Sequence, residues 1–411
     1  MQTSASNPHQ PEEVNNHVHS TYSFSPYSPT QITEAAVEAG LKTVGLIDHD
    51  AIAGGPEFLT AARSNGIAAT VGCEIRVHLN GTPLEGKRVN NPDEPNIIYI
   101  AFHGIPANQF EATDQFLKPI RAARLKRSQA ETEKLNAWLQ QRHGPTLDFA
   151  TDIQPCSRIQ EGGTITERHI CFALAKKLIQ QHGNGEALTT FLNEHLGLSP
   201  SKKIAHQLHE ESNPHRIYDL LGFLKAELVP HFFIPSGTDE CPSARDAAAF
   251  ARSIHAIPAY AYLGDVSESP TGDKRAQTFE DSFLDQLINT LKELGFQAIT
   301  YMPPRNTHKQ LQRLQQLCHH HGLMEISGVD INSSRQSFNC PILLDPAFQH
   351  LCDAAWALIA HEKCAAQNET LGLFHPENPL IDQSLETRVQ HYATIGRNMN
   401  PHQPENIKEL L

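Results

Sequence analysis

Two histidines separated by a single residue, His17 and His19, stand near the start of the chain in the stretch NNHVHSTYSFSPYS. On an extended strand, side chains two residues apart point to the same face, so both imidazoles could bind one cation. The eight cysteines are scattered without a C-x-x-C pair, so histidine and carboxylate rather than thiolate are the expected ligands. The alternative is a chance pair in a chain with 24 histidines, and the remaining polar residues must decide.

Ligand-type side chains also stand at the ends of later apolar runs. They are Asp48, His49 and Asp50 in GLIDHD, Glu74 in GCEI, His103 in IAFH and Asp330 in SGVD. Imidazole and carboxylate together suit Zn, Mn or Fe, and a carboxylate such as Glu74 can bridge two ions. A first-row metal lowers the pKa of bound water from about 15.7 toward about 7, which permits hydrolysis without a protein nucleophile. Neither a G-x-S-x-G nor a P-loop pattern is present, so we expect metal-dependent hydrolysis.

Seven apolar runs that read as strands alternate with helical segments. They are EVNNHVHS, KTVGLIDHD, IAATVGCEIRV, NIIYIAFHG, IPAYAYLG, FQAITYMP and LMEISGVD. This alternation predicts an α/β protein with a parallel sheet, and one chain with seven strands favours a nearly closed (β/α)7, TIM-like barrel. The alternative is an open, doubly wound sheet. In a barrel the C-terminal ends of the strands meet at one mouth, where the ligand-type residues would converge.

The pattern of predicted strands and helices changes along the sequence and divides the chain into four parts. They are a first part of the barrel at 14–105, a helical insertion between strands four and five at 106–256, a second part of the barrel at 257–337, and a C-terminal helix with a polar tail at 338–411. The tail from about residue 366 is expected to be partly disordered. The first predicted helix, SPTQITEAAVEAG, has Thr30 as its expected N-cap and Gly40 as its stop.

The formal net charge of -13, with both signs mixed along the chain, argues against general binding to nucleic acid or to an anionic membrane surface. No run of 18 or more apolar residues occurs, and the N-terminal segment lacks the basic and apolar regions of a signal peptide. We therefore expect a cytoplasmic protein that acts on a small molecule. The oligomeric state does not follow from the sequence.

The order of the segments HVHS, GLIDHD, GCEI, IAFH and SGVD resembles that of the PHP family, the polymerase and histidinol phosphatase domains. IRAARLKRSQAETEKLNAW and TITERHICFAL are similar to segments of its stand-alone members of the nucleoside-bisphosphate phosphatase type. The resemblance implies a distorted seven-stranded barrel with a metal cluster. It also implies a first metal site from His17, His19, Glu74 and Asp330, a second from Glu74 and His103, and a third that includes His49.

This chain departs from the family pattern at three positions. Phe24 stands where the resemblance implies Asp or His, and Tyr262 and Asn332 stand where it implies histidines. The first site keeps every implied ligand, whereas the second loses one and the third loses two. We therefore expect one firm divalent metal site and an incomplete second one, holding Mn, Zn or Fe. Tyr262 and Asn332 could still act as weak oxygen ligands or as hydrogen-bond donors to a substrate.

Cations outside the cluster would be needed to recognise a phosphate. Arg121, Arg124 and Arg127 follow one another at helical spacing in the insertion, and a guanidinium can bind phosphate through two parallel hydrogen bonds. The alternative is a solvated helix face. The resemblance adds His169 as a substrate-binding candidate, in TERH where the family has an RPH-like segment. His49 and Asp50 are the candidates for proton transfer or for orienting the ligands.

We therefore predict a metal-dependent phosphoesterase that hydrolyses a small phosphorylated metabolite or nucleotide with metal-activated water. Two alternatives remain open. One is a metal hydrolase of a non-phosphate bond, because a reduced cluster resembles the sites of the amidohydrolase barrels. The other is a catalytically silent PHP-fold binding protein, for which Phe24, Tyr262 and Asn332 are the support.

Overall fold

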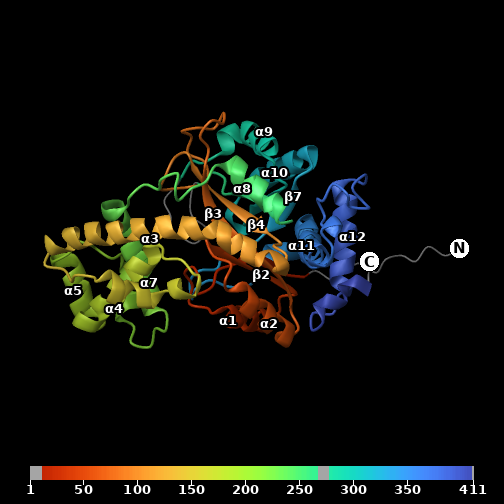
Figure 1. The fold of residues 1–411 in the computed structure, drawn as a ribbon. Coiled ribbons are helices and arrows are strands. Elements are labelled where there is room, and N and C mark those ends of the chain that lie inside the picture. The colour runs from red at the N-terminus through yellow and green to blue at the C-terminus, as the bar shows by residue number, and fades with distance from the viewer. Residues whose placement is uncertain (1–11, 267–276, 410–411) are drawn as a thin grey trace.

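A seven-stranded sheet forms the centre of the computed structural model, which describes residues 12–266 and 277–409 (Figure 1). The strands lie side by side in chain order. They are β1 (Val14–Val18), β2 (Thr43–His49), β3 (Ala68–His78), β4 (Ile97–His103), β5 (Ile257–Tyr262), β6 (Ala298–Tyr301) and β7 (Met324–Ser327). Each coincides with one of the seven apolar runs. The prediction of a barrel-like α/β fold is confirmed.

The two ends of the sheet meet where β1 approaches the chain that follows β7. Val18 forms a parallel bridge with Ile331, and the backbone N–H of His19 donates to the carbonyl of Ile331 at 2.9 Å. Gly328 permits this approach, because a Cβ at that position would lie 2.4 Å from the Cβ of His17. The sheet is thus a nearly closed barrel, and the alternative of an open, doubly wound sheet is wrong.

One strand runs against the others, so the prediction of an entirely parallel sheet is wrong at β4. β4 is antiparallel to both β3 and β5. The reason lies in the connection at 79–96, which contains turns but no helix, and a connection without a crossover helix suits an antiparallel neighbour. The register pairs Glu74 with Ala101 and therefore places His103 opposite Gly72. We expected His103 at the mouth of the barrel, but it lies deeper, inside the barrel.

Helices surround the barrel (Figure 1). They are α1 (Pro29–Glu38), α2 (Gly55–Asn65), α8 (Ala244–Ser253), α9 (Leu284–Leu294), α10 (His308–His321) and α11 (Gln349–Gln367). The N-cap of α1 is Ser28 rather than Thr30, because Pro29 takes the first helical position and Ser28 forms a capping box with Gln31. Gly40 follows the last turn with a φ of +77°, as predicted for the stop.

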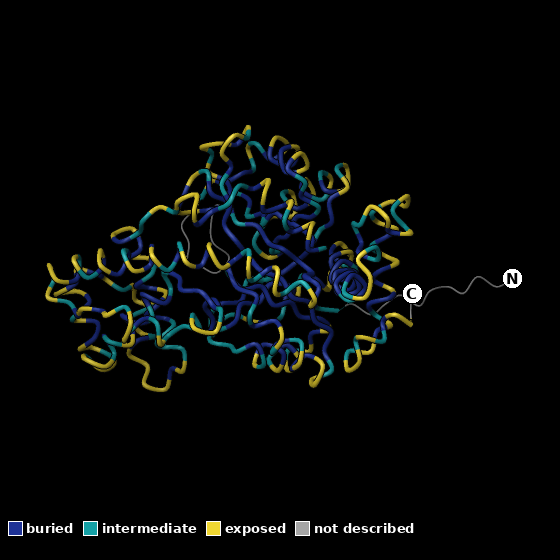
Figure 2. The backbone as a smooth tube through the Cα atoms, in the orientation of Figure 1, coloured by how far each residue is buried: buried dark blue, intermediate teal, exposed yellow. Residues whose placement is uncertain are grey.

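The helical insertion builds a second hydrophobic core beside the barrel. It consists of α3 (Phe110–Gln140), α4 (Glu167–His182), α5 (Glu186–Glu194), α6 (Lys202–His209) and α7 (Arg216–Phe232). Figure 1 shows the long helix α3 running from the barrel into this arm, so one helix belongs to both parts. Figure 2 shows buried backbone in the sheet and along the inner side of the arm, with exposed residues on its outer turns.

The C-terminal tail is ordered against the barrel, which corrects the expectation of partial disorder. α12 (Leu385–Asn398) packs on α11, and a Cβ at Gly396 would lie 2.4 Å from the carbonyl oxygen of Trp356. Arg397 in α12 pairs with Glu12 and Asp353, at 2.7 Å each. The sequence alone does not predict this packing, because α12 has few apolar positions and they contact residues of α11. None of the described helices combines the length and apolar character needed to cross a membrane.

Candidate metal centre

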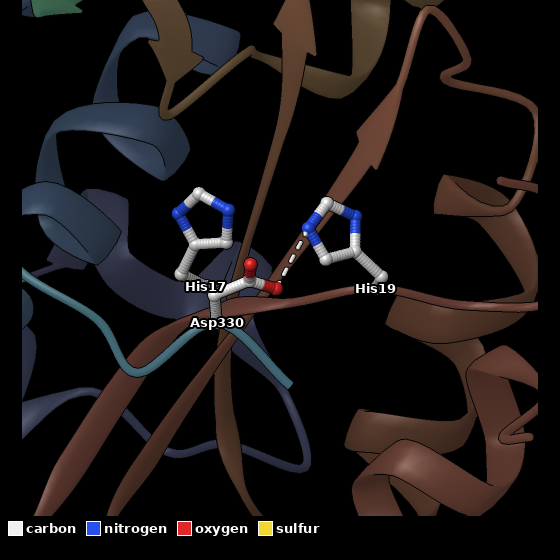
Figure 3. Close-up of side chains that lie close together, drawn as sticks. All are labelled: His17, His19 and Asp330. Carbon is white, nitrogen blue, oxygen red and sulfur yellow. Dashed lines mark ion pairs between the residues drawn. The ribbon is translucent and has the colours of Figure 1, made fainter. Parts of the chain in front are cut away.

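Two histidines and one aspartate converge at the closure of the barrel (Figure 3). His17 lies in β1, His19 directly follows it, and Asp330 lies three residues beyond β7. The Nε2 atom of His19 is 3.2 Å from Oδ1 of Asp330, and one ligand atom from each of the three residues falls within 4.8 Å of the others. Figure 3 shows the Asp330 carboxylate between the two imidazole rings. The two histidines are buried, whereas the Asp330 side chain is 39% exposed.

A second group shares His19 with the first and adds His49 and Glu74. Nδ1 of His49 lies 2.9 Å from Oε2 of Glu74, and the rings of His19 and His49 stack with their centroids 4.5 Å apart. The same Glu74 oxygen is 4.0 Å from Nε2 of His17. Burial raises the pKa of Glu74, but His49 and His17 outweigh it and hold that pKa below its usual range. Glu74 is therefore an ionised carboxylate between two imidazoles.

His103 lies beneath these groups and supports the assignment of a cation site. Both of its ring nitrogens are buried and have no hydrogen-bond partner among the described residues. Burial, with a further contribution from His17, lowers the pKa of His103 to about 3, so its ring is neutral. Buried polar atoms are nearly always paired, and a neutral imidazole that lacks a partner has a lone pair free for a metal. The donor set of imidazoles and carboxylates fits a first-row divalent cation.

The three residues that depart from the family pattern have different surroundings. The Tyr262 hydroxyl donates to Oδ1 of Asp281 at 2.6 Å, and its ring is buried in the core outside the barrel. The Asn332 amide donates to Oδ1 of Asp330 at 2.7 Å, which is the same oxygen that faces His19. Phe24 is buried in the core of the insertion. Of the three, only Asn332 directly contacts a metal-ligand candidate.

Asp50 is held by α3 rather than free within the cluster. Its side chain forms a buried ion pair with Arg124, and its backbone carbonyl accepts from Arg121 at 3.2 Å. Asp50 adopts a φ of +50°, which lets its side chain turn away from the strand direction toward this helix. His49, by contrast, is 22% exposed in its side chain and touches Glu74. His49 thus belongs to the group with His19 and Glu74, whereas Asp50 does not.

The arginines of α3 are buried, so the alternative of a solvated helix face is wrong. Arg121 pairs with Asp114 at 2.6 Å. Arg127 pairs with three carboxylates, Glu131 at 2.6 Å, Glu240 at 2.7 Å and Glu167 at 2.9 Å. Glu167 also lies 3.6 Å from Arg124, and Glu240 pairs with Arg76 of β3. The network joins the barrel to α3 and α4.

Our reading of the sequence missed these carboxylates. Glu131 could have been found, because it stands four residues after Arg127 on the same helix. Glu240 carried no local signal, since 113 residues separate it from Arg127. Ser20, which contacts Asp48, and Ser23, which contacts His19, were likewise noticed only as small polar residues.

Arg168 is a cation near the cluster whose side chain forms no ion pair or hydrogen bond with the part of the chain that the structure describes. It lies in the first turn of α4 and is half-buried. Although burial opposes them, His19 and His17, with a smaller contribution from Arg168, hold the pKa of Asp330 well below its usual range. The neighbouring His169 is neutral, because burial lowers its pKa to about 3, and its Nδ1 accepts from the backbone of Thr166. Arg168 thus acts on the cluster through its charge near Asp330.

The network predicts a pH effect on stability through Glu131. Burial, followed by the charge of Glu167, raises the pKa of Glu131 from 4.5 to about 7, and one of its oxygens has no partner. The folded state then binds a proton more tightly than the unfolded state. This contribution to stability is complete below pH 4.5 and is lost as the pH rises through 7. Glu131→Gln should remove this pH dependence. The difference in free energy of unfolding between the variant and wild type should therefore be more favourable to the variant at pH 8 than at pH 5, by on the order of 1–3 kcal/mol.

Urea unfolding at the two pH values measures this difference. Glu133→Gln is the matched control, because Glu133 is exposed on the same turn of α3. Parallel pH trends in wild type and Glu131→Gln would show that Glu131 is ionised in the folded protein.

Comparison with known protein families finds a match for the first part of the chain, which includes His17, His19 and Glu74 but not Asp330. Residues 15–156 match the model of the PHP domain. Over 61 residues the chain is 41% identical to an error-prone DNA polymerase of Nocardia farcinica, a stretch that is 14% of this chain and 5% of the polymerase. Over 65 residues it is 40% identical to a 5'-3' exoribonuclease of Haemophilus influenzae, covering 16% of this chain and 24% of that protein. The matches thus span under a quarter of either relative.

Two solved structures share the fold over most of their length. An amidohydrolase from Chromobacterium violaceum, with bound sulfate and no metal, superposes with a TM-score of 0.52 over 83% of this chain and 96% of that one, at 18% identity. A proposed metal-dependent phosphoesterase from Bifidobacterium adolescentis superposes with a TM-score of 0.50 over 84% and 97%, at 19% identity. At this identity the likeness concerns the fold.

Proposed function

We propose that the chain is a metal-dependent phosphoesterase that cleaves a small phosphorylated metabolite or nucleotide, since residues 15–156 match the PHP domain and the fold is similar to that of a proposed metal-dependent phosphoesterase. The observation that carries the proposal is the convergence of His17, His19, Glu74 and Asp330 at the closure of the barrel. A divalent cation bound there would lower the pKa of a water ligand and neutralise phosphate oxygens. We propose one firm cation site at these residues and a second, incomplete one toward His49 and His103.

The residues around the centre have different roles in this proposal. The exposed side of Asp330 marks the direction from which a substrate can approach, since the histidines are buried. His49, hydrogen-bonded to Glu74 and partly exposed, is the group that can transfer a proton. Asp50 acts by orientation, because its ion pair with Arg124 joins the loop after β2 to α3. Asn332 fixes the Asp330 carboxylate by its hydrogen bond.

Phosphate recognition falls first to Arg168 in this proposal. A guanidinium without a carboxylate partner can bind phosphate through two parallel hydrogen bonds. Arg121 is a second contributor, because its partner Asp114 is 37% exposed and an anion can compete for this pair. His169 lines the same turn of α4. Arg124 and Arg127 support the site by holding Asp50 and α4, and Tyr262 lies outside the cluster.

One observation favours a second candidate function, hydrolysis of a non-phosphate bond. The three arginines of α3 all have carboxylate partners, which leaves less positive charge for a phosphate than their sequence suggests. An amide or ester substrate needs no such charge. The similar fold of an amidohydrolase is consistent with this alternative.

Metal analysis joined to a substrate screen tests the proposal. Protein purified without chelator should contain at least about one equivalent of Mn, Fe or Zn per chain, and Glu74→Ala should lose more than half of it, because Glu74 faces both histidine groups. The metal-loaded protein should then release phosphate from small phosphomonoesters. Turnover of amides or lactones alone would favour the second candidate. Less than half an equivalent, unchanged in the variant, would leave a catalytically silent binding protein.

A further inference from the structure

The loop after β1 is held by Asp48, the penultimate residue of β2. Oδ1 of Asp48 accepts from the backbone N–H of Ser20 at 2.7 Å and from the hydroxyl of Ser23 at 2.6 Å. Oδ2 accepts from the Ser20 hydroxyl at 2.6 Å. Asp48 is 1% exposed, so all three bonds are sheltered from water. Asp48 stands among the ligand-type residues of the sequence, but its carboxylate oxygens accept hydrogen bonds from the loop after β1.

Ser23 connects this carboxylate to a metal-ligand candidate. Its Oγ lies 3.3 Å from Nδ1 of His19, and Ser23 is completely buried. A hydroxyl has one proton, and that of Ser23 is donated to Asp48. Toward His19 the oxygen can then only accept, so the imidazole must carry a proton on Nδ1. The lone pair is left on Nε2, the atom that faces Asp330.

The residue after Ser23 anchors the loop from the opposite side. The ring of Phe24 is 6% exposed and packs edge-on against His169 at 4.9 Å and Phe172 at 5.7 Å, both in α4. Ser23 is thus held between the barrel, through Asp48, and the helical insertion, through Phe24. Phe24, one of the three positions at which this chain departs from the family pattern, thus fixes the loop by apolar packing.

We propose that Ser23 is a positioning residue for the metal centre, which orients His19 and selects the form of its imidazole with Nε2 free to bind a cation. Hydrogen bonds to the far nitrogen of a ligating histidine set both its orientation and its basicity. The hydroxyl of Ser23 relays the charge of Asp48 to that nitrogen. This inference rests on the proposed metal site at His17, His19 and Asp330.

Removal of the hydroxyl tests the proposal in the full-length protein. Ser23→Ala should weaken Zn²⁺ binding about 10- to 100-fold, measured by competition with a chromophoric chelator. It should also shift the visible absorption bands of the Co²⁺-loaded protein, because the ligand field changes when one imidazole turns. The chelator-treated variant should stay folded, with a melting temperature only slightly below that of the control, because Asp48 keeps both hydrogen bonds from Ser20. Ser25→Ala is the matched control, since Ser25 is buried in the same loop and, among the described residues, its hydroxyl accepts only from the backbone of Tyr27.

The outcomes separate this inference from the proposed function. If Ser23→Ala binds Zn²⁺ as wild type does, or if Ser25→Ala loses equal affinity, Ser23 does not position His19. A loss of affinity in a variant that no longer folds without metal would assign Ser23 a structural role and also overturn the proposal. His17→Ala reports on the site itself. Equal Zn²⁺ affinity in wild type and His17→Ala would overturn both the metal site and the inference that rests on it.

Discussion

Asp330→Asn should lower kcat/KM for the phosphomonoester identified in the screen by at least about 1,000-fold, which corresponds to about 4 kcal/mol of transition-state stabilisation. The physical reason is the loss of the one ligand candidate that combines a negative charge with an exposed side toward the substrate. An amide of the same shape keeps the hydrogen bond from Asn332 but removes the charge that faces His19. A weaker cation site would stabilise the charge of the reacting phosphate less.

Steady-state kinetics with the metal in excess measures this effect. Asp382→Asn is the control, because Asp382 is exposed in the connection before α12. The expected pattern is a fall in kcat that added metal does not restore. Wild-type kcat in Asp330→Asn would remove Asp330 from the centre, and full restoration by metal would restrict its role to affinity.

Arg127→Met should cost about 3–5 kcal/mol of the free energy of unfolding. Arg127 is buried and contacts Glu131, Glu167 and Glu240, so the substitution leaves three carboxylates near one another without this cation. Breaking a buried ion pair from one side costs far more than the pair contributes, because the remaining charge stays desolvated. Methionine matches the length of the side chain, which keeps the packing loss small.

Urea unfolding measures the stability of Arg127→Met against Lys126→Met, an exposed neighbour on α3. The two roles considered for Arg127 give opposite results. A supporting role in the network predicts the loss of stability. Unchanged stability together with a raised KM for the phosphate ester would assign Arg127 to the substrate.

Local patterns in the sequence were sufficient for the strands and for the candidate ligands. Each apolar run that we read as a strand is a strand, because the apolar residues of a buried strand are contiguous in sequence. The spacing of His17 and His19 places both on one face for the same local reason. The end of α1 at Gly40 followed from the freedom of glycine at positive φ.

Tertiary structure decided what depends on partners distant in sequence. The direction of β4 follows from how the chain at 79–96 returns to the sheet, and it moved His103 from the mouth to the interior. The arginines of α3 looked like a phosphate site because only two of their partners, Asp114 and Glu131, lie on the same helix. Their other partners, Asp50, Glu167 and Glu240, come from segments 40 to 113 residues away. Charge is therefore visible in the sequence, but whether it is free or neutralised is settled only when the chain folds.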